Sequence, residues 1–126
     1  MPGKGSLLVV DDEPVFHSIL TDIFRPLGYT LHCCLNGIEA AEYYRVNKSA
    51  IDVVILDMNM PKMSGAQCFR RLKEINPGVR VIIASGYGDN SERDALKKEG
   101  VEFSIQKPYK AAELCEKIEA LMANAP

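Results

Sequence analysis

The sequence predicts an α/β fold, a three-layer sandwich in which helices cover both faces of a parallel sheet. Two observations support this fold class. Short apolar runs, mostly rich in β-branched or aromatic residues, recur five times, and the segments between them carry apolar residues at helical spacing. Strands that alternate with helices pair in parallel through right-handed crossovers. The chain has 126 residues, so we expect one domain over 1–126, with a core of about residues 6–123 and short flexible tails.

Each expected strand is one of these apolar runs. The strands are expected at Leu7–Val10, Tyr29–Leu35, Val53–Leu56, Val79–Ala84 and around Phe103 and Ile105. The second run is more polar than the others, which is typical of a strand at the edge of a sheet.

Turn and capping residues mark where the helices begin and end. Pro14 can open the first helix, because the first N–H of a helix needs no partner. Asn36-Gly37, Asn76-Pro77-Gly78 and Gly100 fall at element ends, and the last helix begins beyond Pro108.

Three of the expected helices carry an apolar stripe that should face the sheet. The stripes are Val15, Phe16, Ile19, Leu20 and Ile23 in the first helix, Cys68, Phe69, Leu72 and Ile75 in the third, and Leu114, Ile118, Leu121 and Met122 in the last. The fourth helix, at 91–99, offers little beyond Ala95 and Leu96, so we expect it to be the least anchored.

Composition and charge argue against several classes of protein. A formal net charge of −2 is far from the basic balance of a nucleic-acid surface. The longest apolar runs are much shorter than the roughly 18 residues of a membrane span, and Ser6–Val10 is too short for a signal-peptide core, so we expect a cytoplasmic location. The cysteines form no C-x-x-C pair and no metal-site spacing, which favours reduced packing residues.

Side chains that can bind a metal ion or take part in catalysis lie at the ends of four expected strands. Asp11 and Asp12 follow the first strand, Asp57 follows the third, Ser85 the fourth and Lys107 the fifth. Open α/β sheets bind ligands beyond the carboxyl ends of their strands. One polar residue at a strand end is usually only a surface residue, but four such ends together bring carboxylates, a hydroxyl and an amine to one edge.

This set of side chains favours a divalent cation and phosphoryl chemistry. Carboxylates crowded at one edge would raise each other's pKa unless a cation lay between them. Oxygen-only ligands favour Mg²⁺ or Mn²⁺ and leave coordination positions for phosphoryl oxygens. A carboxylate can then act as the nucleophile toward phosphorus while an ammonium balances the developing charge.

Four segments together resemble the receiver domain of response regulators. They are Val9–Pro14, Leu56–Pro61 with Gly65, Ala84–Gly86 and Lys107–Pro108, in the family's order and each at a strand end. The resemblance covers nearly the whole chain. It implies a flavodoxin-like five-stranded parallel sheet of order 2-1-3-4-5, and a signalling domain of a two-component or phosphorelay system rather than an enzyme.

The resemblance also assigns roles to individual residues. It implies that Asp57 is the phosphoacceptor, that Lys107 pairs with the phosphoryl oxygens, and that Ser85 is the hydroxyl that moves toward them. It further implies a cis peptide bond between Lys107 and Pro108. Tyr87, together with the residue two positions beyond Asp57, would tune the loss of the phosphoryl group.

A Mg²⁺ or Mn²⁺ ion would take its ligands from the same strand ends. The resemblance implies Asp12 and Asp57 as direct ligands, together with the main-chain carbonyl of Asn59. Asp11 would complete the acidic pocket without binding the ion directly.

The resemblance implies partners as well. The phosphoryl donor would be a histidine kinase or a histidine phosphotransfer protein, and the signal would pass to an output domain, a downstream protein or a second copy of the chain. Gly3-Lys4-Gly5 also resembles the junction before a receiver at the carboxyl end of a hybrid sensor kinase, so the sequence admits a larger parent protein.

One position departs from the family. The last strand commonly carries an aromatic residue three positions before the lysine, and Ser104 stands there. Phe103 is one place away and should point to the opposite face, into the core. Two alternatives are therefore open: the signal passes through Tyr87, Tyr109 or the fourth helix, or the domain relays the phosphoryl group without a large change of its surface.

Other functions fit the residues less well. An aspartyl-phosphate phosphatase usually has a second Asp two positions after its nucleophile, where this chain has Asn59. A flavodoxin would meet the repulsion of Asp11, Asp12 and Glu13 at its phosphate loop. His17 and His32 lack partners at ligand spacing, so solvent-facing or packing roles are expected for both.

Overall fold

Strands and helices alternate along the chain in the computed structural model, which describes residues 4–60, 62–86 and 90–123. The strands are β1 (Gly5–Val10), β2 (Tyr29–Cys34), β3 (Val53–Asp57), β4 (Val81–Ser85) and β5 (Phe103–Gln106). The helices are α1 (Pro14–Phe24), α2 (Gly37–Asn47), α3 (Gly65–Ile75), α4 (Asn90–Lys98) and α5 (Ala111–Ala123), with a 3-10 turn at Lys48–Ala50.

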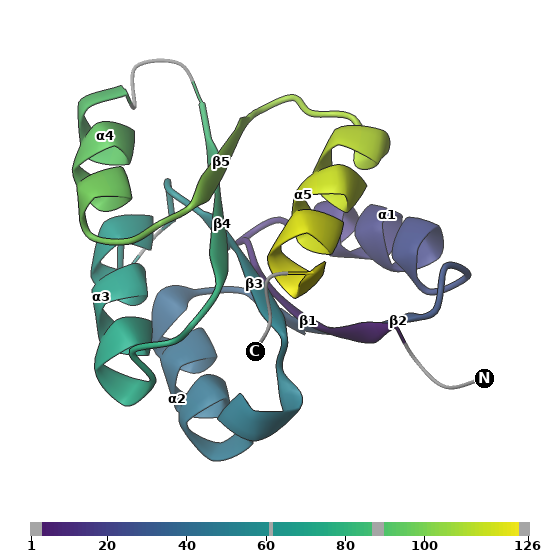
Figure 1. Cartoon of the computed structure of the whole chain (residues 1–126), viewed down its shortest axis with the longest axis horizontal. Helices are drawn as coiled ribbons and strands as arrows, with labels where there is room; N and C mark the ends of the chain where they lie inside the picture. Colours follow the sequence, from purple (N-terminus) through teal and green to yellow (C-terminus); the bar gives the residue numbers. More distant parts are fainter. Residues whose placement is uncertain (1–3, 61, 87–89, 124–126) are drawn as a thin grey trace.

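The strands form one parallel sheet in the order β2-β1-β3-β4-β5. Helices α1 and α5 cover one face, and α2, α3 and α4 cover the other (Figure 1). The expected fold class and strand order are therefore confirmed, and β2 lies at an edge of the sheet as its polar composition indicated.

Alternation along the strands divides the core into two layers. In β1, Leu8 and Val10 belong to the cluster under α2, α3 and α4, while Leu7 and Val9 belong to the cluster under α1 and α5. Every residue of β3 is buried, because a central parallel strand is covered on both faces.

The cysteines are free and contribute to the packing. Cys34 and Cys68 lie in the cluster beneath α2 and α3. Burial is the main cause that raises the pKa of both thiols to about 12, so they remain protonated and unreactive at neutral pH.

The structure corrects the expected apolar stripe of α1. The buried residues of this helix are His17, Leu20 and Phe24, whereas Val15 and Ile19 are 71% and 49% exposed. Neighbouring helix positions differ by about 100° in direction, so these two side chains turn away from the sheet.

Two smaller expectations were also wrong. Strand β4 begins at Val81, because the Val79 N–H donates to the Asn76 carbonyl in the preceding turn. In α4, Ala95 is exposed and Leu96 alone is buried among the residues whose side chains the structure describes. The weak anchoring expected for α4 is consistent with this single buried contact.

Gly65, the first residue of α3, lets this helix approach the end of β3. A Cβ at this position would lie 2.5 Å from the Asp57 carbonyl oxygen and 2.6 Å from the Met58 Cα. The Gly65 N–H donates to the Met58 carbonyl at 3.0 Å, so the backbone cannot easily move away.

Gly65→Ala should therefore lower the free energy of unfolding by about 1–3 kcal/mol, because the added methyl overpacks against main-chain atoms. Urea unfolding measures the change. Gly78→Ala is the matched control, because a Cβ there meets only the Asn76 Oδ1 at 3.5 Å, and its effect should stay within about 0.5 kcal/mol. Equal stability of the Gly65 variant and the native protein would contradict this account of the close approach.

Candidate functional site

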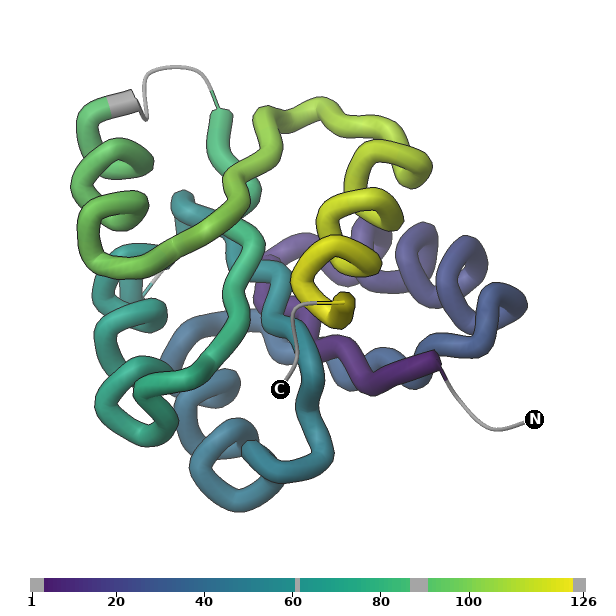
Figure 2. The backbone as a smooth tube through the Cα atoms, in the orientation of Figure 1, coloured from purple at the N-terminus to yellow at the C-terminus, as the bar shows by residue number. Residues whose placement is uncertain are grey.

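The sheet register brings the expected site residues together at the carboxyl ends of the strands. Val10 pairs with Leu56, so the next residues, Asp11 and Asp57, come side by side. Ser85 is the last paired residue of β4, and its carbonyl accepts the Lys107 N–H at 2.7 Å. Strands β3, β4 and β5 all run toward the upper part of the view in Figure 2.

Asp11 is buried and held by hydrogen bonds on several sides. Its N–H donates to the Cys34 carbonyl of β2 at 3.1 Å. Its Oδ1 accepts the Glu13 N–H at 3.0 Å, and its Oδ2 accepts from the Lys107 Nζ at 2.9 Å. The first carboxylate of the site therefore has a fixed position.

Lys107 joins the two buried carboxylates. Its Nζ lies 2.9 Å from the Asp11 Oδ2 and 3.3 Å from the Asp57 Oδ1. Burial alone would lower the pKa of Lys107, but the hydrogen bonds and charges of Asp11 and Asp57 outweigh burial and raise it. The amine is therefore a permanent cation at physiological pH, placed where anionic oxygens can meet it.

Asp57 lies at the bottom of the site and is only 5% exposed. Its Oδ1 accepts the Asn59 N–H at 3.2 Å. Burial is the main cause that raises the pKa of Asp57, and the charge of Asp11 raises it further, although Lys107 and the Asn59 N–H act in the opposite direction. The ionised carboxylate is thus short of compensating positive charge, a condition that a bound cation would relieve.

The donor set fits a hard divalent cation. One carboxylate oxygen each from Asp11, Asp12 and Asp57 lies within 4.8 Å of the others. Asp12 is exposed while the other two acids are buried, so the group opens to solvent on one side. Oxygen ligands of this kind suit Mg²⁺ or Mn²⁺. The structure does not test the role expected for the Asn59 carbonyl, which stays a prediction.

Ser85 places a hydroxyl at the end of β4, next to β3. The residue is fully buried, and its Oγ has no hydrogen-bond partner among the described residues. A buried hydroxyl without a partner is rare in folded proteins. It is therefore well suited to donate to an oxygen that arrives with a ligand.

A cavity of about 400 Å³ lies beside Lys107. Its lining residues are Glu13, Phe16, Gly86, Lys107, Pro108 and Tyr109. The Lys107 Nζ lies 5.3 Å from the centre of the Phe16 ring, and Tyr109 meets that ring edge-on at 5.6 Å. No single sequence motif predicts this cavity, because its lining combines residues at the start of α1 with residues that follow β4 and β5.

The structure describes three of the other features that the sequence singled out: the Lys107–Pro108 bond, Ser104 and Phe103. The Lys107–Pro108 bond is cis, as the resemblance implied. Ser104 and Phe103 are both partly buried, and Phe103 packs against the cluster under α1 and α5. Tyr87 lies outside the described residues.

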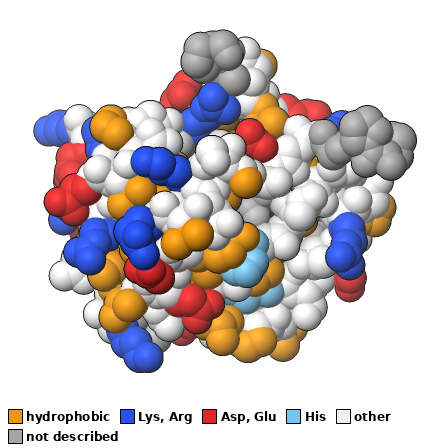
Figure 3. Space-filling view, turned by 90° about the horizontal axis from the view of Figure 1, so that it is seen from below, with side chains coloured by type: hydrophobic (Ala, Val, Ile, Leu, Met, Phe, Trp, Pro, Cys, Tyr) orange, Lys and Arg blue, Asp and Glu red, His pale blue; other side chains and the backbone are white. Residues whose placement is uncertain are grey.

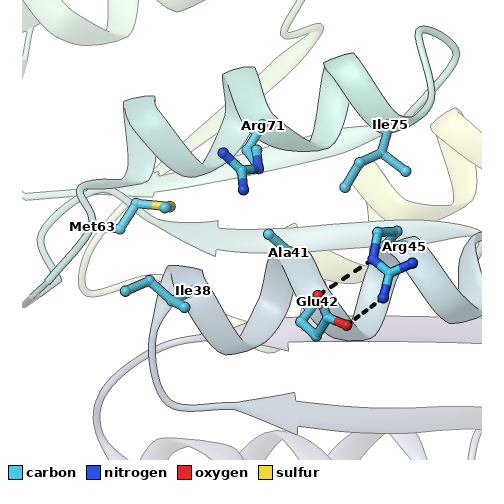
Figure 4. A pocket seen from close by; sticks show the side chains of 7 residues that line it. All are labelled: Ile38, Ala41, Glu42, Arg45, Met63, Arg71 and Ile75. Carbon is cyan, nitrogen blue, oxygen red and sulfur yellow. Dashed lines mark hydrogen bonds and ion pairs between the residues drawn. The ribbon is translucent and has the colours of Figure 1, made fainter.

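A second hollow, between α2 and α3, is separate from the acids. It has a volume of about 390 Å³ and is lined by Ile38, Ala41, Glu42, Arg45, Met63, Arg71 and Ile75. Glu42 and Arg45 pair with each other along α2 (Figure 4). This hollow lacks the cluster of carboxylates that distinguishes the strand ends.

Acidic and basic side chains are interspersed on the face in Figure 3, with apolar side chains between them. No helix in the described parts of the chain has the length and apolar character to cross a bilayer.

Comparisons with known proteins agree with the site. The family model described as response regulator receiver domain matches residues 7–119. The chain is 32% identical over 108 residues to sporulation initiation phosphotransferase F of Bacillus subtilis, covering 86% of each chain. It is 25% identical to sensor kinase CckA of Brucella abortus over 97% of its own length, but spans only 13% of that kinase.

Two solved structures are similar over most of their length. A response regulator receiver domain protein from Clostridium thermocellum superposes with a TM-score of 0.91 at 32% identity, covering 94% of each chain. A CheY from Borrelia burgdorferi, solved in a complex with CheX, BeF₃ and Mg²⁺, superposes with a TM-score of 0.87 at 29% identity, covering 94% of this chain and 89% of the other.

Asp57→Asn should raise the free energy of unfolding at pH 7.5, without divalent cations, by about 1 kcal/mol, because it removes a poorly compensated buried charge. The raised pKa of Asp57 means that the folded state keeps its proton to higher pH than the unfolded state. Ionisation of Asp57 therefore weakens folding as the pH rises through this window, and the advantage of the variant should shrink at pH 4.5.

Urea unfolding in EDTA at both pH values measures this difference. Asp52→Asn is the control, because Asp52 is exposed and lies just before β3 begins, at the opposite end of that strand from Asp57. If the stability gained by Asp57→Asn instead grew toward pH 4.5, ionisation of Asp57 would not weaken folding, and the prediction would be wrong.

Proposed function

The chain belongs to the response regulator receiver family, and from this premise we propose that it accepts a phosphoryl group on Asp57. The donor is the phosphohistidine of a histidine kinase or a histidine phosphotransfer protein. The observation that carries the proposal is the grouping of Asp11, Asp12, Asp57 and Lys107 at one sheet edge. The domain acts as a signalling module rather than as an enzyme with an external substrate.

The residues of the site divide the work of transfer. A carboxylate oxygen of Asp57 attacks phosphorus, so that a P–O bond forms as the P–N bond of the donor breaks and the donor imidazole leaves. Lys107 and the Asn59 N–H hold the Asp57 carboxylate in place through its Oδ1. A Mg²⁺ or Mn²⁺ ion held by Asp12, Asp57 and the Asn59 carbonyl, with Asp11 completing the pocket, would balance the charge of the phosphoryl oxygens. The similar structure that contains BeF₃ and Mg²⁺ supports this ion.

Ser85 and Lys107 respond to phosphorylation by contacting oxygens of the phosphoryl group. The buried Ser85 hydroxyl has no partner in the described part of the chain, and an acylphosphate oxygen supplies one. Ser85 is the last residue of β4, and α4 is the next helix along the chain. Movement of Ser85 therefore bears on a helix that has one buried residue, Leu96, among those whose side chains the structure describes. Phosphorylation thus biases two arrangements of the same fold.

The onward route on the β5 side differs from the common family pattern, because Ser104 offers no ring that could rotate inward. Tyr109 is an aromatic alternative that the structure describes. Its hydroxyl is buried without a partner among the described residues, and its ring contacts Phe16, over which Lys107 lies. Phe16 belongs to α1, so a change at Lys107 or at Tyr109 can reach this helix through the Phe16 ring.

The exposed face of α1 offers a place for the phosphoryl donor. Val15 and Ile19 are one helical turn apart and largely exposed. They adjoin Glu13 and Phe16, which line the cavity beside Lys107. An apolar patch that adjoins the cavity beside Lys107 is a surface on which a docking partner can bind when it delivers its phosphohistidine.

The match to a small part of sensor kinase CckA and the junction-like Gly3-Lys4-Gly5 are compatible with a larger response regulator or hybrid kinase. We retain the prediction that residues 1–126 form a single domain in the cytoplasm. Output domains, downstream proteins and a second copy of the chain are its candidate partners.

Binding of a phosphoryl mimic tests the proposal. Mg²⁺ with beryllofluoride should shift the amide resonances of Asp57, Ser85 and Lys107 in the native protein, because the mimic completes the charge balance of the site. The Asp57→Asn variant should show at most the shifts caused by Mg²⁺ alone. Asp52→Asn, which changes a carboxylate outside the site, should respond like the native protein. Equal responses of the native protein and the Asp57 variant would refute the proposal.

Ser85→Ala should distinguish binding of the phosphoryl mimic at Asp57 from the change that this binding causes in α4. We expect beryllofluoride to bind about fivefold more weakly, which corresponds to the loss of one hydrogen bond of about 1 kcal/mol. The shifts in α4 should fall by more than the shifts at Asp57. If the variant reproduced the full response of α4 at saturation, Ser85 could not be the moving hydroxyl.

A further inference from the structure

His17 is a buried polar residue that the phosphoryl-accepting chemistry leaves unused. It lies on the inner face of α1 and is 6% exposed. Its Nε2 lies 2.6 Å from the main-chain oxygen of Asp11, the acid that follows β1. A side chain on the helix therefore contacts the loop that carries Asp11 and Asp12, two of the three acids of the pocket.

The chemistry of this contact fixes the proton on the His17 ring. A carbonyl oxygen only accepts hydrogen bonds, so Nε2 must donate. The other ring nitrogen, Nδ1, is buried and has no partner in the described part of the chain. Among these residues, the contact with Asp11 is thus the ring's only hydrogen bond.

The main chain of Asp11 is held from two directions. Its N–H donates to the Cys34 carbonyl of β2 at 3.1 Å, and its carbonyl accepts from His17 at 2.6 Å. The first contact fixes the end of β1 against the sheet. The second fixes the peptide group that joins Asp11 to Asp12, from which the exposed carboxylate of the cluster projects.

We propose that His17 is a positioning residue of the phosphoryl-accepting site. It holds the Asp11–Asp12 peptide so that both carboxylates face the divalent cation together with Asp57. This inference rests on the proposed function, because it assigns His17 a task only if a cation binds there. It goes beyond that function by extending the site to a residue that contacts no ligand.

The demands of Mg²⁺ explain why such a residue matters. This ion requires short distances and nearly octahedral geometry, so the position of each ligand strongly affects affinity. Asp12 is exposed and lies in a loop between β1 and α1, where its side chain lacks the packing that fixes Asp57. Groups that hydrogen-bond to metal ligands without contacting the metal commonly lower metal affinity by about 10- to 100-fold when they are removed.

Two variants of similar side-chain length isolate the hydrogen bond. His17→Gln places an amide N–H at about the reach of Nε2, and His17→Met fills similar space without a donor. A Mg²⁺ titration of the full chain, followed by amide resonances of residues 11–13, gives the dissociation constant. We expect a rise of about tenfold in His17→Met, at the lower end of the usual range because the contact acts through the main chain, and about twofold or less in His17→Gln.

Thermal unfolding without Mg²⁺ distinguishes positioning from a purely structural role. A structural role would lower the unfolding temperature of His17→Met and leave its dissociation constant unchanged, and this result would overturn the inference. Equal weakening of Mg²⁺ binding in both variants would overturn it as well, because the amide donor should rescue the site. A native protein that binds no Mg²⁺ would overturn the proposed function and this inference together.

Discussion

One ammonium group between two buried carboxylates organises the functional end of this molecule. Lys107 reaches Asp11 and Asp57 from the end of β5, although these acids lie at the carboxyl ends of two different strands in the middle of the sheet. The arrangement leaves a net negative charge in a buried place. Burial is the main cause that raises the pKa of Asp57, and the charge of Asp11 raises it further. A site in this condition attracts a cation, and a cation in turn attracts phosphoryl oxygens.

The geometry of the parallel sheet makes this meeting of charges possible. The pairing of Val10 with Leu56 aligns the ends of β1 and β3, and the contact of Lys107 with the Ser85 carbonyl aligns the ends of β4 and β5. The two apolar layers on either side of the sheet hold these registers. Burial of the core is therefore what keeps unlike and like charges within a few ångströms of one another.

The sequence predicted the sheet and the acidic pocket well, because both depend on local patterns. Apolar runs mark the strands, and the residue after each run must lie at the carboxyl edge. The failures have a common physical cause. Val15 and Ile19 are apolar at helical spacing, but spacing alone does not say which side of α1 faces the sheet. The contact of His17 with Asp11 and the Phe16–Tyr109 wall depend on how separate elements pack, which no single segment encodes.

The metal site, the switch and the positioning role of His17 all depend on the identity of the phosphoryl acceptor. The most direct measurement is to incubate the native protein with Mg²⁺ and acetyl phosphate, reduce the acylphosphate with borohydride and locate the modified residue by peptide mass spectrometry. We predict modification at Asp57, with none when Mg²⁺ is withheld. Modification at another acidic residue, or an equal yield without Mg²⁺, would contradict the account.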